Sequence, residues 1–529
     1  MKRPRALFFV MERKSGKRKP SSEVTCSTRT QAQIDRALMF FADDGPKGSY
    51  DQIGTFRAIA GAYVHAANPQ SEGVLCNEID FLATKLEKAR QFNPTYVGHM
   101  LSRTAIPAML GDFVARITGS NTVAREVSLQ ESALEIEATR ALLDIVGFDP
   151  KRASGTFTSG GTMANFTALL VARKLLEVKH GGEVDKIRVF TSPFAHYSVF
   201  KAIDALGGPK HAMEAVRVRQ KGLRMDPADL DRKMVEACRD GIAMITMPIG
   251  GETETGLVDK LDEIASISWK YRSPMIVDAA YGAPYRLSRA GWKFDGMEKA
   301  FAVTLDVHKC LYTPYGGGWV GFRSARDHAL IGNVHAEYVK FQPAETEEQR
   351  QRLARNFRRG EGQLGQKRYE GSMSAGAFLS TLEVMRTLGK DGLGTVLDLT
   401  LDRIDFLYQR LCKSDVFEPL HKPDLNLLCF AIRPELYHAL RIRNDDGNRR
   451  VVEETRKELD NNILGKDGHF FSSTGIPTGP KGETTYSYRA CIMHPRTTDE
   501  IVDNAVNGLE GLVKKRMTRT RFSGKSFSR

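Results

Sequence analysis

One stretch of the chain combines residue types that could carry out chemistry. Asp306, His308 and Lys309 directly follow the apolar run Phe301–Leu305. Lysine seldom ends a buried strand unless its amine has a charged partner or takes part in a reaction. In a desolvated pocket the amine can stay neutral and form a Schiff base with a carbonyl compound. The first expectation is therefore a reactive Lys309 at the end of a strand.

A second stretch offers an anion site. The turn formed by Ser159, Gly160, Gly161 and Thr162 leads into an amphipathic helical pattern. Such a turn presents backbone N–H groups, a hydroxyl and a helix dipole to an anion, and phosphate is the natural ligand. Taken alone, the same turn is also an ordinary helix start capped by Thr162.

Two more side chains occupy comparable positions. His196 follows the predicted strand Lys186–Thr191 and opens a helix, where a lone histidine is more often a cap or a surface residue. Asp278 directly follows the apolar run Pro274–Val277. A carboxylate buried there needs a cation, a metal or several hydrogen-bond donors, and a cap or a salt bridge would explain it if it stood alone.

Taken together, these groups match the needs of pyridoxal 5'-phosphate (PLP). The glycine-rich turn would anchor the phosphate and His196 would stack on the ring. Asp278 would keep the pyridine nitrogen protonated, so that the ring accepts electrons, and Lys309 would bind the aldehyde carbon. Four independent coincidences are needed to dismiss this interpretation, so the sequence predicts a PLP enzyme.

The elements that position these residues alternate between strand and helix. Short β-rich runs at 186–191, 243–247, 274–277, 301–305 and 318–322 are separated by amphipathic stretches such as 165–178 and 261–271. This rhythm predicts a mainly parallel sheet covered on both faces, with ligands beyond the carboxyl ends of its strands. We divide the chain into a basic N-terminal tail and helical segment (1–91), a large cofactor-binding domain (92–375), a small C-terminal domain (376–513) with strands near 427–432 and 485–492, and a basic tail (514–529). The polar stretch 343–370 predicts a mobile loop or an exposed helix.

Composition argues against other classes of protein. The net charge is +13, but residues 1–20 and 514–529 carry +7 each, which leaves −1 for the rest of the chain. The basic character thus belongs to two ends predicted to be mobile, and we predict no nucleic-acid partner. Seven cysteines lie singly with no paired spacing, no residue cluster has metal-ligand spacing, and no run is long enough to span a membrane. These features predict a cytoplasmic protein without a metal site.

Five motifs carry a family resemblance: SGGTMAN (159–165), HYSVFKA (196–202), VDAAYGA (277–283), LDVHK (305–309) and GGGWVGF (316–322). Over roughly residues 92–500 the chain resembles the group II PLP-dependent amino acid decarboxylases, relatives of the glutamate, aromatic amino acid and tyrosine decarboxylases. The resemblance implies an α/β fold of the PLP-dependent transferase type I, like aspartate aminotransferase. It also implies a mainly parallel seven-stranded sheet with a smaller α+β C-terminal domain, and a homodimer whose active sites lie at the subunit interface.

The resemblance also implies residue roles. The phosphate would lie on Ser159–Thr162, Ala280 would lie against the ring face opposite His196, and His308 would lie near the phosphate and the reacting centre. For an amino acid substrate, the resemblance places His99 and Ser102 in the pocket and lets Arg489 contact a substrate carboxylate. A structural salt bridge is the alternative role of Arg489.

Departures from the family pattern concern the substrate. Glu252 stands where a threonine is expected, and its carboxylate would repel an acidic substrate or pair with a basic one. Met373 replaces an arginine, and the tyrosine of the catalytic loop has two candidate matches, Tyr338 and Tyr369.

The predicted reaction is α-decarboxylation of an L-amino acid to an amine and CO2, with the cofactor on Lys309. Two alternatives keep the cofactor: a carbon–carbon lyase acting on a phosphorylated amino alcohol, and a decarboxylation-dependent oxidative deaminase that releases an aldehyde. An alternative of another class is a non-catalytic binding protein with basic tails.

Overall fold

The structure is a computed structural model that describes residues 29–42, 52–68, 70, 72–86, 92–207, 212–331, 346–359, 364–461, 469–477 and 484–523. Its strands are β1 (Ser154–Thr158), β2 (Lys186–Thr191), β3 (Ala212–Arg217), β4 (Gln220–Lys221), β5 (Arg224–Met225), β6 (Ala243–Met247), β7 (Ile276–Asp278), β8 (Ala302–Leu305), β9 (Gly318–Phe322), β10 (Phe417–Pro419), β11 (Leu427–Ile432), β12 (Ser472–Pro477) and β13 (Thr484–Cys491). Its α-helices are α1 (Gln31–Leu38), α2 (Gln52–Ala67), α3 (Glu72–Leu86), α4 (Ile106–Thr118), α5 (Leu129–Ile145), α6 (Gly161–His180), α7 (Tyr197–Leu206), α8 (Pro227–Arg239), α9 (Leu261–Lys270), α10 (Ala325–His328), α11 (Glu347–Arg359), α12 (Gly376–Thr387), α13 (Gly389–Cys412), α14 (Asp445–Asn461) and α15 (Asp499–Ser523). Short 3-10 helices are η2 (Ala283–Leu287), η3 (Gly291–Phe294), η4 (Met297–Lys299), η5 (Ala329–Ile331), η6 (Gly365–Lys367) and η7 (Pro434–Leu436).

Seven strands form the central sheet. Hydrogen-bonded groups in the orders β1-β9-β8-β7 and β3-β2-β6 are joined by parallel bridges from Thr246 to Met275 and from Ile249 to Asp278. All neighbours pair in parallel except β9, which is antiparallel to both β1 and β8. Only a short connection without a crossover helix separates β8 from β9, and such a connection allows only antiparallel pairing. The predicted mainly parallel sheet is confirmed.

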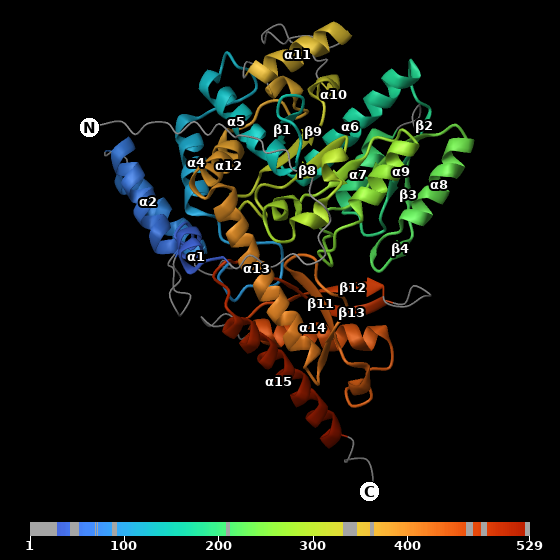
Figure 1. Cartoon of the computed structure of the whole chain (residues 1–529). Helices are drawn as coiled ribbons and strands as arrows, with labels where there is room; N and C mark the ends of the chain where they lie inside the picture. The colour runs from blue at the N-terminus through green and yellow to red at the C-terminus, as the bar shows by residue number, and fades with distance from the viewer. Residues whose placement is uncertain are drawn as a thin grey trace.

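A smaller unit lies below the central sheet in Figure 1, and the long helix α13 runs from one part to the other. Its antiparallel sheet has the order β10-β11-β13-β12 and packs against α14 and α15 through a separate hydrophobic core. An early segment joins this unit, because Val97 donates to the Phe470 carbonyl and accepts from Cys491 N–H. The C-terminal strands predicted at 427–432 and 485–492 are present as β11 and β13.

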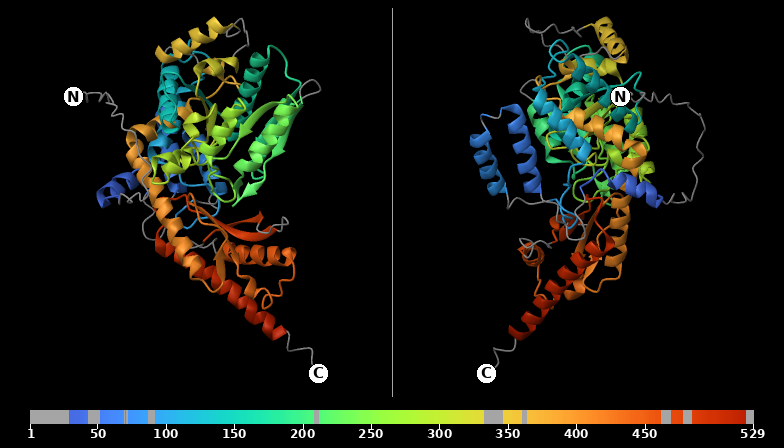
Figure 2. Two further views of the ribbon diagram at one scale, coloured as in Figure 1. Left: turned by 45° about the vertical axis from the view of Figure 1, so that its right-hand side comes forward. Right: turned by 90° about the vertical axis from the view of Figure 1, so that its left-hand side faces the viewer.

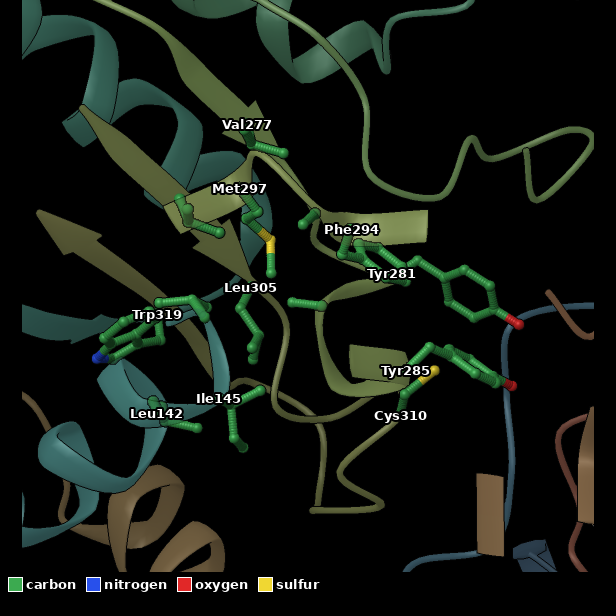
Figure 3. Close-up of a cluster of buried hydrophobic side chains, with 14 of the residues drawn as sticks. Leu142, Ile145, Val277, Tyr281, Tyr285, Phe294, Met297, Leu305, Cys310 and Trp319 are labelled. Carbon is green, nitrogen blue, oxygen red and sulfur yellow. The ribbon is translucent and has the colours of Figure 1, made fainter. Parts of the chain in front are cut away.

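A buried cluster beneath the central sheet fixes β7 and β8 in place. Figure 3 shows Val277, Leu305 and Trp319 from neighbouring strands close to Leu142 and Ile145 of α5. The Trp319 ring lies over a neighbouring glycine: a Cβ atom on Gly155 would come within 2.6 Å of it. Because Asp278 ends β7 and Lys309 follows β8, this packing determines where these two predicted site residues lie.

Several expectations differ in detail from the structure. Strands β1 and β3 were not expected, since SGTFT and AMEAVR lack the dense β-branched pattern that indicates a buried strand. Helix α15 continues through Ser523, so part of the region expected as a mobile basic tail is helical. The stretch expected as a loop or exposed helix contains α11. Tail 1–20 lies outside the described residues, and the proposed domain boundaries stay a prediction. Among the described helices, none combines the length and the hydrophobicity that a membrane span requires.

Candidate active site

A pocket of about 320 Å³ gathers most of the predicted site residues. It lies at the carboxyl ends of the strands, as the sheet topology predicts for a ligand site. Its walls come from the β1–α6 turn, the start of α7, the loop after β6, and the ends of β7 and β8. The predicted residues that line it are Ser159, Gly160, Gly161, Thr162, His196, Asp278, Ala280, His308 and Lys309.

The turn from Ser159 to Thr162 forms an anion cradle. Gly160 is the N-cap of α6 and provides no side-chain cap, so the first N–H groups of the helix remain available. Gly318 lets β9 approach this turn closely, because a Cβ atom at that position would lie 2.4 Å from the Gly160 carbonyl carbon. This close approach explains a glycine in the run 316–318. One donor is already used: the Ser159 N–H donates to the Glu370 carboxylate at 3.1 and 3.2 Å.

Asp278 is held at the end of β7 by a set of donors. Its carboxylate is buried and accepts from Asn165 Nδ2 at 2.9 Å and from the Ala280 N–H at 3.2 Å. Thr304 fixes the Asn165 side chain by donating to its Oδ1 at 2.8 Å. These donors satisfy a buried carboxylate without a cation, so it stays available to hold a proton on a ligand nitrogen.

His196 is connected to the same network. It caps α7, and the Ser198 N–H donates to its Nδ1 at 3.3 Å, while the Ser198 hydroxyl lies 2.7 Å from that nitrogen. Asn165 Nδ2 donates to the same hydroxyl at 3.1 Å. Burial lowers the pKa of His196, which favours the neutral imidazole. With Nδ1 accepting, its remaining proton is on Nε2, and the ring keeps one orientation.

Lys309 pairs with a carboxylate that was not among the predicted site residues. Its Nζ lies 3.0 Å from Asp306 Oδ2. Burial disfavours the Lys309 ammonium, but the carboxylates of Asp306 and Asp278 together act in the opposite direction, so the pKa of Lys309 is raised. Among the described residues, Asp306 Oδ1 is buried without a hydrogen-bond partner, and Asp306 lies close to Gly161 of the cradle. A polar ligand with a hydrogen-bond donor would satisfy this oxygen.

His308 has a defined tautomer. Its Nδ1 lies 2.7 Å from the Gly317 carbonyl, which can only accept, so Nδ1 carries the proton. Burial lowers the pKa of His308, which leaves a neutral ring with an unprotonated Nε2 that lies 3.8 Å from Asp306. This side chain can therefore accept a proton inside the pocket.

The three residues predicted to bind substrate do not line this pocket. Arg489 of β13 donates to the carbonyls of Gly98 at 2.8 Å and Thr253 at 2.6 Å. His99 Nδ1 is hydrogen-bonded to the Tyr96 hydroxyl, and Ser102 Oγ is buried. The guanidinium of Arg489 thus connects three segments, and its neighbour Thr253 reaches the pocket wall.

Glu252 does not face the pocket either. Its carboxylate is buried in its own loop, where it accepts from the Glu254 N–H and from the N–H and hydroxyl of Thr255. In the structure, the Glu252 carboxylate therefore caps its own loop and does not lie where it could select a substrate. Tyr369 contacts Phe166 outside the pocket, and Tyr338 lies outside the described residues.

The buried Glu252 predicts a pH-dependent stability. Burial raises its pKa from an ordinary value of 4.5 to about 7. The folded protein then holds the proton more tightly than the unfolded chain, so this group makes the free energy of unfolding fall as the pH rises from about 4.5 to about 7. The contribution is a few kcal/mol. Thermal unfolding measured between pH 5 and 8 should show a smaller decline for Glu252→Gln than for the wild type, and equal declines would contradict this role.

The sequence predicted no specific role for four residues of the site: Asn165, Ser198, Thr304 and Asp306. All except Thr304 lie within the quoted motifs, Asn165 in SGGTMAN, Ser198 in HYSVFKA and Asp306 in LDVHK. Asn165 and Asp278 are distant in sequence, so no local spacing indicates their contact. Within the described residues, no group of three or more His, Cys, Asp or Glu side chains could hold a metal.

The residues present fit PLP, because an anion cradle, a buried carboxylate, two neutral imidazoles and an amine line one pocket. Two carboxylates oppose a phosphate in the cradle. Glu370 accepts from the Ser159 N–H, and Asp306 lies beside Gly161, where its pairing with Lys309 reduces its effect.

Comparisons with known proteins agree with this fit. A family model described as the pyridoxal-dependent decarboxylase conserved domain matches residues 66–433. The aspartate 1-decarboxylase of Aliivibrio fischeri is 28% identical over 458 residues, which cover 78% of this chain and 78% of the relative. The L-2,4-diaminobutyrate decarboxylase of Rhizobium meliloti is 28% identical over 340 residues, which cover 64% and 65%.

Among solved structures, Oryza sativa TDC with PLP and tryptamine has the same fold. Its TM-score is 0.70 at 16% identity, and the match covers 83% of this chain and 88% of that chain. The predicted type I fold and the predicted cofactor are therefore confirmed. The chain belongs to the pyridoxal-dependent decarboxylase family and is a PLP-dependent amino acid decarboxylase.

Proposed function

We propose that the pocket holds PLP and removes the α-carboxyl group of an L-amino acid to give the corresponding amine. One observation carries the assignment of roles: the cradle, Asp278 and Lys309 line a single pocket. When bound, PLP supplies an electron-accepting ring conjugated to the substrate. Ser159, Gly160, Gly161 and Thr162 bind its phosphate through the first N–H groups of α6 and their own polar atoms.

The remaining residues position the ring and handle protons. Asp278 holds a proton at the pyridine nitrogen, and Asn165 keeps the Asp278 carboxylate in place. His196 and Ala280 lie against the two ring faces. Lys309 would hold the cofactor through its amine, and once the substrate amine takes that place, the freed Lys309 in its ammonium form could donate a proton to the substrate. His308 Nε2 can accept a proton on the side of Asp306.

One experiment, which measures turnover of labelled substrates, tests the reaction. The PLP-loaded protein is incubated with a pool of carboxyl-labelled L-amino acids, and released CO2 and products are measured, the products by mass spectrometry. Aspartate and 2,4-diaminobutyrate belong in the pool because two relatives are named for them. Labelled CO2 with a matching amine supports the proposal. CO2 with an aldehyde favours the oxidative deaminase, and no CO2 favours the lyase or the binding protein.

The contact between Ser159 and Glu370 gives a prediction about cofactor affinity. Glu370→Ala frees the Ser159 N–H, so affinity for PLP should rise about threefold to tenfold, the effect of one hydrogen bond worth about 1 kcal/mol. Affinity is measured by titrating the apoprotein and following protein fluorescence. Pyridoxal, which lacks the phosphate, should bind both proteins equally, and Glu435→Ala on the surface is the matched control. Equal PLP affinities would contradict this competition.

We also propose that two chains form a homodimer. Large apolar side chains are exposed along α4, and further ones along α2 and α3, which Figure 2 shows as a pair of helices at the side of the molecule. The α4 set is Ile106, Met109, Leu110, Phe113, Val114 and Ile117. An apolar surface of this extent in a folded chain is normally covered by a partner.

The expected particle is a dimer of the 58.9 kDa chain. Leu110→Lys combined with Phe113→Lys places charges on the exposed face of α4 and should give monomers in sedimentation velocity at micromolar concentration. Val178→Lys, at a similarly exposed apolar residue of α6, should remain dimeric. A monomeric wild-type chain would contradict the proposal.

The cytoplasmic location and the lack of a nucleic-acid partner belong to the same proposal. They are supported by cysteines that lie singly along the sequence and by a net charge of −1 between the two basic ends. The amines released from the labelled amino acids do not depend on where the enzyme is located or on whether it binds nucleic acid.

A further inference from the structure

A second hollow, here called the basic groove, lies at the edge of the central sheet opposite to the active site. It has a volume of about 1140 Å³ and is built where β7 and β8 begin, around Met275 and Phe301. The ends of α6 and α9 and the start of α10 complete its walls, all of them in the upper half of Figure 1. At the other ends of the same strands, Asp278 is the last residue of β7 and Lys309 follows β8.

Six cationic side chains line the basic groove. Three of them have acidic partners: Lys270 pairs with Asp231, Lys299 with Asp262, and Arg326 with Glu347. The other three are Lys179, Arg272 and Arg323. Within the described part of the chain, none of these three lies within 4 Å of a carboxylate oxygen. The groove therefore offers three cationic groups to an anion.

One acidic residue, Asp327, lies among these cations. Burial raises the pKa of its carboxyl group, and the charges of Arg326, Lys179 and Arg323 act in the opposite direction. Lys179, Arg323 and Arg326 line the same groove as Asp327. A ligand phosphate would meet more positive than negative charge there.

Arg272 lines the groove at the C-terminal end of α9. It follows the end of α9 with φ of 54°, in the left-handed region that favours glycine. The helix ends around it in the usual way, with Arg272 N–H donating to Trp269 and Ser273 N–H donating to Ser268. Glycine would adopt this conformation without strain. The helix end thus fixes the backbone at Arg272, and its side chain lines the groove.

Trp269 adds an aromatic surface. Its side chain is 82% exposed at the end of α9 and lines the same groove. A tryptophan so exposed has little to contribute to the core, but a planar ring of a ligand can stack on it.

We propose that the basic groove binds a nucleotide, with its phosphates on Arg272, Arg323 and Lys179 and its base on Trp269. The combination of a few cations with one exposed aromatic ring in a bounded hollow fits a small phosphorylated ligand with a planar ring. A nucleic-acid duplex needs a longer basic surface, and the body of this chain has a net charge of only −1.

The test uses the full-length, PLP-loaded protein, so that the anion cradle of the active site is occupied. Calorimetry measures the dissociation constants of ATP, tripolyphosphate and adenosine at fixed ionic strength. Arg323→Gln and Arg272→Gly should each weaken ATP binding at least tenfold. Trp269→Ala should weaken ATP binding severalfold and leave tripolyphosphate binding unchanged. Arg441→Gln is the matched control, because Arg441 is an exposed arginine outside the groove with φ of 56°.

The Arg272→Gly variant separates ligand binding from a structural role. Glycine relieves the left-handed strain, so the melting temperature without ATP should stay equal or rise while ATP affinity falls. A lower melting temperature together with unchanged ATP affinity would overturn the proposal. The weakest dissociation constant expected for ATP is roughly 0.1 mM, so ATP is tested at about ten times that concentration, about 1 mM. Failure of ATP to bind at this concentration would also overturn the proposal. Binding of duplex DNA but not ATP would assign the groove to nucleic acid instead.

Discussion

Lys309→Ala is expected to lower decarboxylation by more than about 10³-fold, the scale on which covalent catalysis fails when the nucleophile is removed. The side chain is half-buried, its Nζ lies 3.0 Å from Asp306, and it lines the pocket together with the anion cradle. Among the residues that the structure describes, Lys309 is the lysine that lines this pocket. The variant should also lose the visible absorbance of PLP bound covalently to lysine, which can be recorded independently of turnover.

A matched control is Lys174→Ala. Lys174 is also partly buried, and its Nζ donates to the Leu330 carbonyl away from the pocket. This variant should keep both the absorbance and the turnover of the wild type. Normal turnover by Lys309→Ala would contradict the assigned role of Lys309, whereas equal losses in both variants would indicate a general effect on folding.

Asp278→Asn is expected to lower kcat by about 10²- to 10⁴-fold, the range for removal of a group that controls a proton at the reacting centre. The change preserves the shape of the side chain but leaves one acceptor oxygen, so it keeps either the bond from Asn165 Nδ2 or the bond from the Ala280 N–H, which reach different oxygens of Asp278. It removes the negative charge that would hold a proton on the pyridine nitrogen. PLP should still attach to Lys309, so cofactor absorbance remains while single-turnover release of CO2 slows.

Asp259→Asn provides the control for a buried carboxylate. Asp259 is buried and accepts from the N–H groups of Met225 and Ile249, and it does not line the pocket. We expect this variant to lose about 1–3 kcal/mol of stability and to retain the kcat of the wild type in its folded fraction. An Asp278→Asn variant with unchanged single-turnover rates would refute the role of Asp278.

The sequence predicted the parts of the fold that local pattern determines. Strands β2, β6 and β11 were placed at their observed bounds because β-branched and apolar residues dominate them. Strand β1 was missed because its residues, SGTFT, become strand-like only when Trp319 and Val320 of β9 pair with them. Pairing between distant segments leaves no mark in a local window.

The candidate site divides in the same way. Lys309, Asp278 and His196 each follow or open a recognisable element, so the chemistry of their side chains could be read from the sequence. The role of Asn165 could not be assigned from the sequence, because it consists of a hydrogen bond to an oxygen of Asp278, 113 positions away. The expected substrate contacts of Arg489 were not found in the pocket, since backbone carbonyls of Gly98 and Thr253 take up its donors. Residue type alone does not reveal that a charged group is already satisfied.

The segment that joins the small unit has a consequence for the order of folding during synthesis. Gly98 and Ser472 are 374 positions apart, yet the Ser472 hydroxyl donates to the Gly98 carbonyl, and Val97 pairs with Phe470 and Cys491. A ribosome therefore releases the segment around Val97 long before the strands that cover it exist. Contacts of such separation form late and slowly. The segment around Val97 therefore stays without its partner strands in a partly folded chain until translation nears its end. During that time its exposed apolar residues are suitable ligands for a chaperone.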